Sequence, residues 1–505
     1  MLLVSTKGTT MKDTSLRIPE DRPLLIINED KDHYFKLSSE LMNEQSLRDY
    51  IDDMGQGGHV THIFFCPFGQ RPSYASGVCE PIWAGMEEPD MNHKTHNIWC
   101  VNAKLLHDRG IDPYRVWIER SRENGISPWI SIRMNDAHFV TIENYFRTCN
   151  FWREHPELRR NAEYDPNTGW ESWALDYSKE PVRKFHFSIF TELVDRYAPD
   201  GVELDWMRFA NHLTPGHERE QAHIITEFIR QCREYANNAA RRCGHPISLS
   251  VRVPTLPETA FCFGHSPVEW AAEGLVDLIV PTNFYNANDY AIPLDEWFRI
   301  IGEASPDVLV LPGACNCIHP YPDVATVETC MDYIRAWGDL MYSMGAKGLY
   351  LFNMPYIARE KLDELYGMGM TPRRLADSTR RFPVSFRDCV AHPDMADIQL
   401  PRSTAQENSF AIRLSSIRKD SGVMVVLGFK EDASDVPPME VTLNRIPAID
   451  SMPYEATPQF AGGTFCKAKM AYRFPACAAR EGVNHVRTAR CDGAPANITW
   501  CEVIL

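Results

Sequence analysis

Short apolar runs recur through the first two thirds of the chain, and polar or turn-forming residues bound each of them. Runs of this length and composition are typical of strands that are buried on both faces of a parallel sheet. The pattern predicts eight strands, within residues 24–27, 61–65, 129–133, 201–205, 247–251, 278–280, 308–311 and 348–352.

Longer stretches with the apolar spacing of helices lie between these runs. Ser178 is a candidate N-cap for the predicted helix at residues 182–197. Alternating strands and helices build a parallel sheet covered by helices, and eight such units predict a (β/α)8 TIM barrel. A doubly wound open sheet is the alternative, but the chain has no GxGxxG or GxxxxGK(S/T) phosphate-binding turn. The predicted helices include residues 182–197, 218–242, 268–273 and 324–344.

The pattern changes after residue 367, where Gly, Pro and Arg punctuate a stretch that predicts a linker. Short β-like segments, such as 410–414 and 423–427, then alternate with turn residues, which predicts an all-β sandwich. The expected organisation is an N-terminal extension (1–20), a barrel (21–367), a linker (368–383) and a β-sandwich domain (384–505).

Composition narrows the possible partners. The 505 residues include 52 Lys and Arg against 68 Asp and Glu, a formal net charge of −16, which argues against a nucleic-acid partner. No apolar stretch approaches the ~20 residues of a membrane span, and the polar N-terminus lacks the apolar core of a secretion signal. We therefore expect a cytoplasmic protein with no membrane partner. The 15 cysteines are scattered without a CxxC pair, so we expect free thiols, no metal and no cofactor. A homo-oligomer is compatible with such a barrel.

The active site of a TIM barrel lies at the carboxyl ends of its strands. Asp, Asn, Arg, Tyr and Trp follow the predicted strands at several of these ends, and such planar polar and aromatic groups suit sugar hydroxyls and pyranose faces. The candidate substrate-binding residues are Arg133, Asn135, His138, Trp206, Arg208, Asn283, Tyr285 and Asn353.

The segment from Asp200 to Trp206 carries the clearest chemical signal. The two-residue period of a strand places Glu203 and Asp205 on one face, inside the barrel. Buried acids are costly unless they are hydrogen-bonded or functional. Asp205, at the mouth, is the first candidate catalytic residue. Glu203 is a second candidate, or else a structural acid paired with an arginine.

The same segment resembles strand four of sugar-processing barrels. Family 18 chitinases carry Asp-Gly-x-Asp-x-Asp-x-Glu there, and Asp200, Gly201, Glu203 and Asp205 match in type, but Met207 stands where that family has its proton donor. The α-galactosidase and α-amylase clans place an aspartate nucleophile at the end of strand four, which the resemblance transfers to Asp205. Overall the chain is similar to glycoside-hydrolase-like barrels that carry a C-terminal β-sandwich.

Glycoside hydrolysis needs a second carboxyl group across the scissile bond. Asp136, one strand away from Asp205, ranks first, followed by Asp289 and Glu258. Arg133 and Arg208 are expected to hold a carboxylate, either one of these acids or one on an acidic sugar. His138 is positioned to tune Asp136.

Long loops follow the second and third strands and carry many aromatic residues. They predict a walled pocket and exo-action, with a subdomain core or an oligomer contact as the alternative. The pair His93 and His96 is a weak metal signal. The sequence thus predicts a glycosidase with a carbohydrate substrate. The rivals are a catalytically silent saccharide-binding barrel, motivated by Met207, and a lyase or metal-dependent hydrolase.

Overall fold

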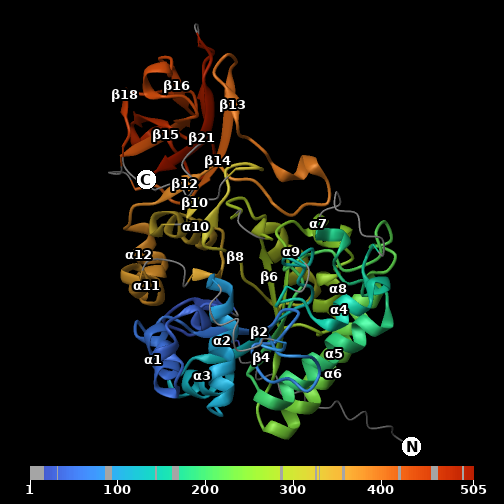
Figure 1. The fold of residues 1–505 in the computed structure, drawn as a ribbon. Helices are drawn as coiled ribbons and strands as arrows, with labels where there is room; N and C mark the ends of the chain where they lie inside the picture. Colours follow the sequence, from blue (N-terminus) through green and yellow to red (C-terminus); the bar gives the residue numbers. More distant parts are fainter. Residues whose placement is uncertain are drawn as a thin grey trace, which may run out of the picture.

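The computed structural model describes residues 16, 18–30, 32–85, 94–142, 145–161, 170–284, 288–324, 327–328, 330–354, 359–418, 422–455, 465–491 and 494–505. Within these ranges the chain forms a parallel barrel and two antiparallel sheets that follow it (Figure 1). None of the helices described there is both long and apolar enough to cross a membrane.

The barrel sheet has the strand order β7-β6-β5-β4-β3-β2-β1-β11-β8, and all of its pairings are parallel. The two end strands, β7 and β8, belong to one short stretch of chain, residues 309–314, so the sheet closes on itself. The predicted eight-stranded barrel is therefore confirmed. Its strands are β1 (Leu24–Glu29), β2 (His62–Phe68), β3 (Ser127–Arg133), β4 (Gly201–Asp205), β5 (Ser248–Pro254), β6 (Leu278–Thr282), β7 (Leu309–Val310), β8 (Gly313–Ala314) and β11 (Gly348–Phe352).

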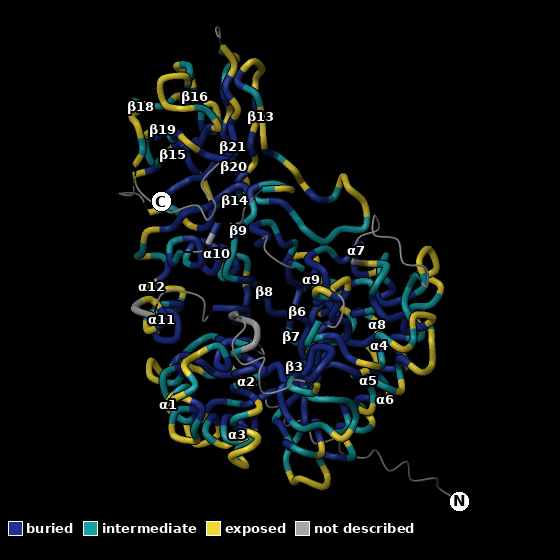
Figure 2. Tube along the Cα trace, viewed as in Figure 1, coloured by how far each residue is buried: buried dark blue, intermediate teal, exposed yellow. Residues whose placement is uncertain are grey.

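Helices surround this sheet, and the strands are buried while the exposed residues gather on the outer helices and loops (Figure 2). The helices are α1 (Glu44–Gly55), α2 (Lys94–Asp108), α3 (Pro113–Glu123), α4 (Asn150–Glu154), α5 (Glu180–Tyr197), α6 (Ala222–Cys243), α7 (Pro257–Cys262), α8 (Pro267–Ala272), α9 (Leu294–Ala304), α10 (Met331–Ser343), α11 (Arg359–Tyr366) and α12 (Pro372–Ala376).

Two details of the helix prediction are wrong. The helix expected from residue 324 begins at Met331, because Val327 pairs with Ile318 in the small hairpin of β9 (Cys317–Ile318) and β10 (Val327–Glu328). Both side chains are buried in a cluster with Trp500 of the C-terminal domain, so tertiary packing overrides the local helical spacing. Ser178 does not cap α5 either, since Lys179 is the N-cap and Ser178 Oγ accepts from Thr214 Oγ1 instead.

The C-terminal domain consists of a six-stranded and a four-stranded antiparallel sheet. Strand β14 alternates buried and exposed residues, as expected for a strand with one face against a core, so the predicted all-β sandwich is confirmed. The larger sheet contains β12 (Arg381–Pro383), β13 (Arg402–Ser403), β15 (Val423–Phe429), β18 (Asp450–Pro453), β19 (Ala468–Phe474) and β21 (Asn497–Ile504). The smaller contains β14 (Asn408–Leu414), β16 (Val441–Leu443), β17 (Ile446–Pro447) and β20 (Gly482–Thr488).

Residues 368–383, expected as a linker, fold into a 3-10 turn (Met368–Met370), α12 and β12. Strand β12 pairs with β21 at the edge of the larger sheet. Arg381 on β12 forms a buried ion pair with Glu502, which also accepts from Tyr333 on α10 of the barrel. These contacts join the sandwich to the barrel, and Figure 1 shows the sandwich lying beside α10 and α12.

Candidate active site

The register of β3, β4 and β5 stacks the interior of the barrel in three layers. The lowest layer places Trp129, Gly201 and Ser248 side by side. Gly201 is required there because a Cβ atom would lie 2.4 Å from Cδ2 of Trp129. The middle layer aligns Glu203 with two serines, and the top layer aligns Asp205 with two arginines. The full rows are Ser131–Glu203–Ser250 and Arg133–Asp205–Arg252.

Asp205 lies at the mouth of the barrel, and hydrogen bonds hold both of its carboxylate oxygens. Its Oδ1 accepts from the backbone N–H groups of Met207 at 3.0 Å and Arg208 at 3.1 Å. Its Oδ2 accepts from Nη1 of Arg252 at 2.7 Å. Charge-assisted hydrogen bonds of this kind are strong and fix the position of a carboxylate. The arrangement suits a nucleophile or a general base.

Asp136 follows β3 and accepts from a larger set of donors. Arg133 Nη1 lies 2.8 Å from its Oδ2, Arg147 Nη2 lies 3.5 Å from the same atom, and both the backbone N–H and the ring of His138 bond to Oδ1. Arg133 also bonds to Asp30, at the end of β1, over 2.5 Å. The structure therefore brings Asp136, His138 and Arg133 together, as the sequence predicts.

His138 connects Asp136 to Arg208. Because a guanidinium can only donate, the 3.1 Å contact from Arg208 Nη2 makes His138 Nε2 the acceptor, so Nδ1 carries the proton and donates to Asp136. Burial, opposed by Asp136, lowers the pKa of His138 to about 3, so the ring is neutral at neutral pH. Through Arg208, whose backbone holds Asp205, the network joins the ends of β3 and β4.

Glu203 lies one layer below Asp205 and is fully buried. Its Oε1 accepts from Ser131 Oγ at 2.7 Å, Tyr350 Oη at 2.8 Å and Asn28 Nδ2 at 3.3 Å. Its Oε2 has no hydrogen-bond partner among the described residues. Burial raises the pKa of Glu203 to about 7, with Arg252 opposing the shift. The register partners of Glu203 are Ser131 and Ser250, and Arg252, one layer above, bonds to Asp205 and not to Glu203.

Two predicted rim residues turn away from the mouth. The Asn135 amide accepts from the backbone of Leu175 and donates to the carbonyls of Leu175 and Asn211, which ties two loops together. Trp206 follows Asp205 and faces the opposite side of the strand, where its ring packs against Tyr177 and Phe228. Neither side chain is directed into the barrel.

The remaining predicted rim residues come from the later strands. Asn283 follows β6 and is buried beside Thr282, whose Oγ1 donates to its side chain. Asn353 follows β11 with a left-handed φ of 61°, and its Nδ2 points at Cys315 Sγ, 3.6 Å away. A non-glycine residue in this conformation is strained and is often found at functional sites. Tyr285 lies outside the described residues.

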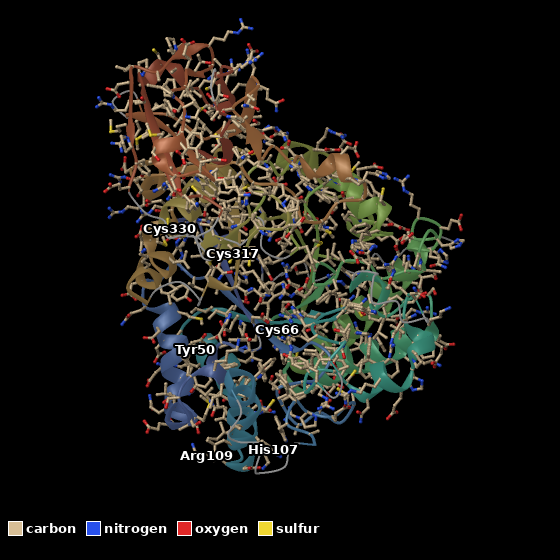
Figure 3. All side chains as sticks on the ribbon, turned by 45° about the horizontal axis from the view of Figure 1, so that its top comes forward. Tyr50, Cys66, His107, Arg109, Cys317 and Cys330 are labelled. Atoms are coloured by element: carbon tan, nitrogen blue, oxygen red, sulfur yellow. The ribbon has the colours of Figure 1, made fainter. Side chains whose placement is uncertain are left out.

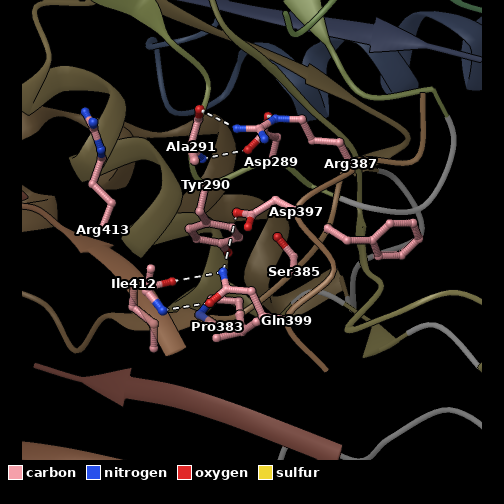
Figure 4. A pocket seen from close by; sticks show the side chains of 13 residues that line it. Asp289, Tyr290, Ala291, Pro383, Ser385, Arg387, Asp397, Gln399, Ile412 and Arg413 are labelled. Atoms are coloured by element: carbon pink, nitrogen blue, oxygen red, sulfur yellow. Dashed lines mark hydrogen bonds and ion pairs between the residues drawn. The ribbon is translucent and has the colours of Figure 1, made fainter. Parts of the chain in front are cut away.

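The two lower-ranked acids have other partners. Asp289 bonds to Arg387 Nε at 2.7 Å and to the backbone N–H of Ala291, in a pocket between the barrel and the sandwich (Figure 4). Glu258 on α7 is 55% exposed and pairs with Arg219. Both contacts are structural in kind, so Asp136 is the acid that the geometry places nearest in the network to Asp205.

Three further residues of the mouth, Asp30, Arg147 and Arg252, were not among the predicted site residues. Asp30 directly follows the first strand, and Arg252 faces inward in the fifth strand by the two-residue period, so both could have been found from strand ends and alternation. Arg147 is 14 residues beyond β3 in a loop, and no local signal directs it to Asp136.

No metal centre emerges from the described part of the chain, where no group of three or more His, Cys, Asp or Glu is arranged to hold an ion. The side chains of His93 and His96 lie outside the described ones. All 15 cysteines are free thiols, as expected from their scattered spacing. Figure 3 shows labelled examples, with Cys66 on a barrel strand and Cys317 and Cys330 nearer the sandwich.

Comparison with known proteins gives remote matches. No known family matches the chain as a whole or in part. A 1,4-alpha-glucan branching enzyme GlgB of Photobacterium profundum is 24% identical over 181 residues, which are 35% of this chain and 21% of that protein. The chain thus matches about a fifth of the length of that relative.

Solved structures with a similar fold include a glycoside hydrolase family 18 N-acetylglucosaminidase from Paenibacillus barengoltzii, 14% identical, with a TM-score of 0.37 over 68% of this chain and 98% of that one. An α-galactosidase from Lactobacillus brevis is 12% identical, with a TM-score of 0.38 over 94% of this chain and 56% of that one. These matches assign no activity to this chain.

Proposed function

We propose that this protein is a carbohydrate-active enzyme and, more narrowly, a glycoside hydrolase that acts at the carboxyl-terminal mouth of its barrel. The observation that carries the proposal is Asp205, a carboxylate at the end of β4 whose position is fixed by hydrogen bonds from two backbone N–H groups and from Arg252. The barrel fold and the strand-four motif support the same class.

In this proposal Asp205 either attacks the anomeric carbon or activates a water molecule. Both roles require an ionised carboxylate whose position is fixed before the substrate arrives. The hydrogen bonds to Met207 and Arg208 fix Asp205 Oδ1, and the ion pair with Arg252 fixes Oδ2. Because both oxygens of Asp205 already accept hydrogen bonds, the proposal assigns the proton donor to a different group.

Asp136 is the second carboxylate of the proposal. It lies one strand away and is linked to the Asp205 segment through His138 and Arg208. It forms ion pairs with Arg133 and Arg147. A role as general acid therefore requires the substrate to displace at least one of these donors, and the 3.5 Å contact with Arg147 is the longer of the two.

Aromatic side chains at the rim support a sugar ligand. Phe139 is 48% exposed beside Tyr145, and Phe209 packs against the ring of His138 and against Phe284. Of Phe139 and Phe209 only the former is exposed, and its ring face near polar groups matches the apolar face of a pyranose. Together with the long segments that follow β2 and β3, they favour an exo-acting enzyme on an oligosaccharide or glycoside.

A lyase is the second candidate function, and the neutral ring of His138 favours it. With Asp136 on Nδ1, Nε2 is the acceptor nitrogen and takes a hydrogen bond from Arg208 Nη2, so in this alternative His138 acts as a general base once the substrate displaces Arg208. A base of this kind removes a proton next to a sugar carboxylate and expels the glycosidic oxygen, leaving a carbon–carbon double bond.

One experiment separates these functions. The protein is incubated with a panel of aryl glycosides and oligosaccharides in water enriched in ¹⁸O, and the products are examined by mass spectrometry. A hydrolase adds one ¹⁸O to each new reducing end, whereas a lyase adds none and releases an unsaturated sugar. Absence of turnover with a sugar-dependent rise in melting temperature would overturn both and favour a silent saccharide-binding barrel.

A further inference from the structure

A pocket of about 480 Å³ lies outside the barrel interior, and none of the residues described at the mouth lines it. The turn after β1, one face of α1 and the end of α11 form its wall. Ser46, Asp49, Tyr50 and Asp53 supply the α1 face, since residues three or four positions apart lie on the same side of a helix. Figure 1 shows α1 lying beside α11. A volume of this size is typical of small-molecule sites.

Aromatic rings make up part of the wall. Tyr34, Tyr50 and Tyr366 line the pocket, and the ring centroids of Tyr34 and Tyr50 lie 5.2 Å apart with their planes at 64°. The hydroxyl of Tyr34 donates to the backbone carbonyl of Leu41 at 2.5 Å, which fixes the ring. Burial raises the pKa of Tyr34 and of Tyr50, so both side chains stay uncharged at neutral pH. The electron-rich faces of such rings attract a cation.

A carboxylate lies beside these rings. Asp49 is close enough to Tyr34 for its negative charge to add to the effect of burial on the pKa of that tyrosine. Its Oδ1 accepts from Gln45 Nε2 at 2.8 Å, one turn earlier on α1, and Asp49 joins no ion pair within the described ranges. Asp49 therefore offers a negative charge that a cationic ligand can meet.

His33, the basic residue of the lining, does not cancel this charge. Its Nδ1 lies 3.0 Å from Oε2 of Glu29, and the two side chains are 4% and 2% exposed. Burial lowers the pKa of His33, but Glu29 and other nearby acids raise it to about 9, so His33 is a cation that Glu29 balances. Among the described residues that line the pocket there is no Lys, Arg, Asn or Gln. The lining therefore suits a cation better than an anion or a sugar, which need such donors.

Apolar side chains complete the pocket. Leu37 and Leu41 line it and are 39% and 41% exposed, whereas Met54 and Leu362 are buried. Covering the two exposed leucines with an apolar group removes their surface from water, which is favourable. The pocket thus combines aromatic faces and a carboxylate with apolar surface, and a positively charged group carried on an apolar body matches all three features.

We propose that this pocket binds a small organic amine, whose ammonium group lies against the tyrosine rings near Asp49 and whose apolar body covers Leu37 and Leu41. The inference does not depend on the proposed glycosidase, because no residue of the mouth takes part in it. Asp49 is exposed, so salt should weaken its attraction for the amine, while the contacts with the rings depend less on salt.

The test uses two probes of equal size, phenethylamine, which is a cation at neutral pH, and phenethyl alcohol, its uncharged counterpart. Isothermal titration calorimetry measures their affinity for wild type, Asp49→Asn, Leu41→Ala and a control, Asp295→Asn, which removes an exposed carboxylate in the first turn of α9. We expect wild type to bind the amine about tenfold more tightly than the alcohol. Asp49→Asn should weaken binding of the amine by about fivefold and leave binding of the alcohol unchanged. Leu41→Ala should weaken both probes alike, and the control should match wild type.

Each other result would overturn the inference. Equal affinity for the two probes would contradict the selection of a cation. Amine binding that neither Asp49→Asn nor Leu41→Ala changes would place the probe outside this pocket, and absence of binding at millimolar concentration would leave the pocket without its ligand. Melting temperatures verify that each variant is folded. Glycoside turnover by the same samples is a separate readout, so loss of this inference and loss of the glycosidase proposal are distinguishable.

Discussion

Arg252 Nη1 lies 2.7 Å from Asp205 Oδ2, and the two side chains are only 3% and 1% exposed. The pair joins neighbouring strands at the mouth of the barrel, since the two residues are register partners on β4 and β5. Because both charges are desolvated, each depends on the other, and the pair couples the stability of the fold to the proposed chemistry.

Removing Arg252 should therefore be costly. We predict that Arg252→Met lowers the free energy of unfolding by about 3–5 kcal/mol, since it leaves Asp205 as a buried charge without its cation. Urea unfolding measures this. The control Arg299→Met breaks an exposed pair with Glu303 and should change stability by less than about 1 kcal/mol. Equal losses of unfolding free energy in the two variants would contradict the prediction that the buried ion pair contributes more to stability than the exposed one.

Glu203 gives a pH-dependent prediction. Its pKa is about 7 in the fold against an ordinary 4.5, so the folded state binds more protons between these values. Its contribution to stability is present below pH 4.5 and is lost as the pH rises through 7. The Glu203→Gln variant does not lose this stability as the pH rises, because its amide does not titrate. Relative to wild type, the variant should gain on the order of 1–3 kcal/mol between about pH 5 and pH 8. A stability difference independent of pH would contradict the assignment.

His265 should produce the opposite pH trend. It is fully buried near Trp206, His212 and Trp270, and desolvation lowers its pKa from 6.5 to about 3. The unfolded chain therefore binds more protons, and stability falls as the pH drops below 6.5. His265→Phe should flatten the fall in melting temperature between about pH 6.5 and pH 4. His155→Gln, at a side chain 45% exposed, serves as the control and should leave the slope unchanged.

Gly201 offers a test of the layered interior. Gly201→Ala forces a methyl group to within 2.4 Å of Trp129 Cδ2 and should cost about 1–3 kcal/mol or more. Gly302→Ala on α9 meets no atom within 4 Å and should stabilise the protein by about 0.5–1 kcal/mol, because alanine favours the helix. Differential scanning calorimetry of both variants checks the pair, and an unchanged stability of the Gly201→Ala variant would refute the packing described for this layer.

The barrel could be predicted from sequence because each strand is a local apolar run. The inward direction of Glu203 and Asp205 could also be predicted, because side chains of a strand alternate with a period of two residues. The hydrogen-bond partners of these two acids could not be predicted. Whether Arg252 meets Asp205 or Glu203 depends on the register between β4 and β5, which no local pattern encodes. Trp206 was predicted at the rim because it follows the fourth strand, but its side chain faces away from the barrel interior. A position at the end of a strand therefore does not determine which side of the strand the side chain faces.

The measurement that tests the central claim most directly is glycoside turnover by wild type and by Asp205→Asn, which keeps the shape of the side chain and removes its charge. The melting temperature of each sample verifies that the variant is folded. We predict that wild type releases sugar and that kcat of folded Asp205→Asn falls by about 10³-fold or more, as expected for loss of the attacking or base carboxylate. A folded variant that retains activity within about tenfold of wild type would contradict the role of Asp205 on which the account depends.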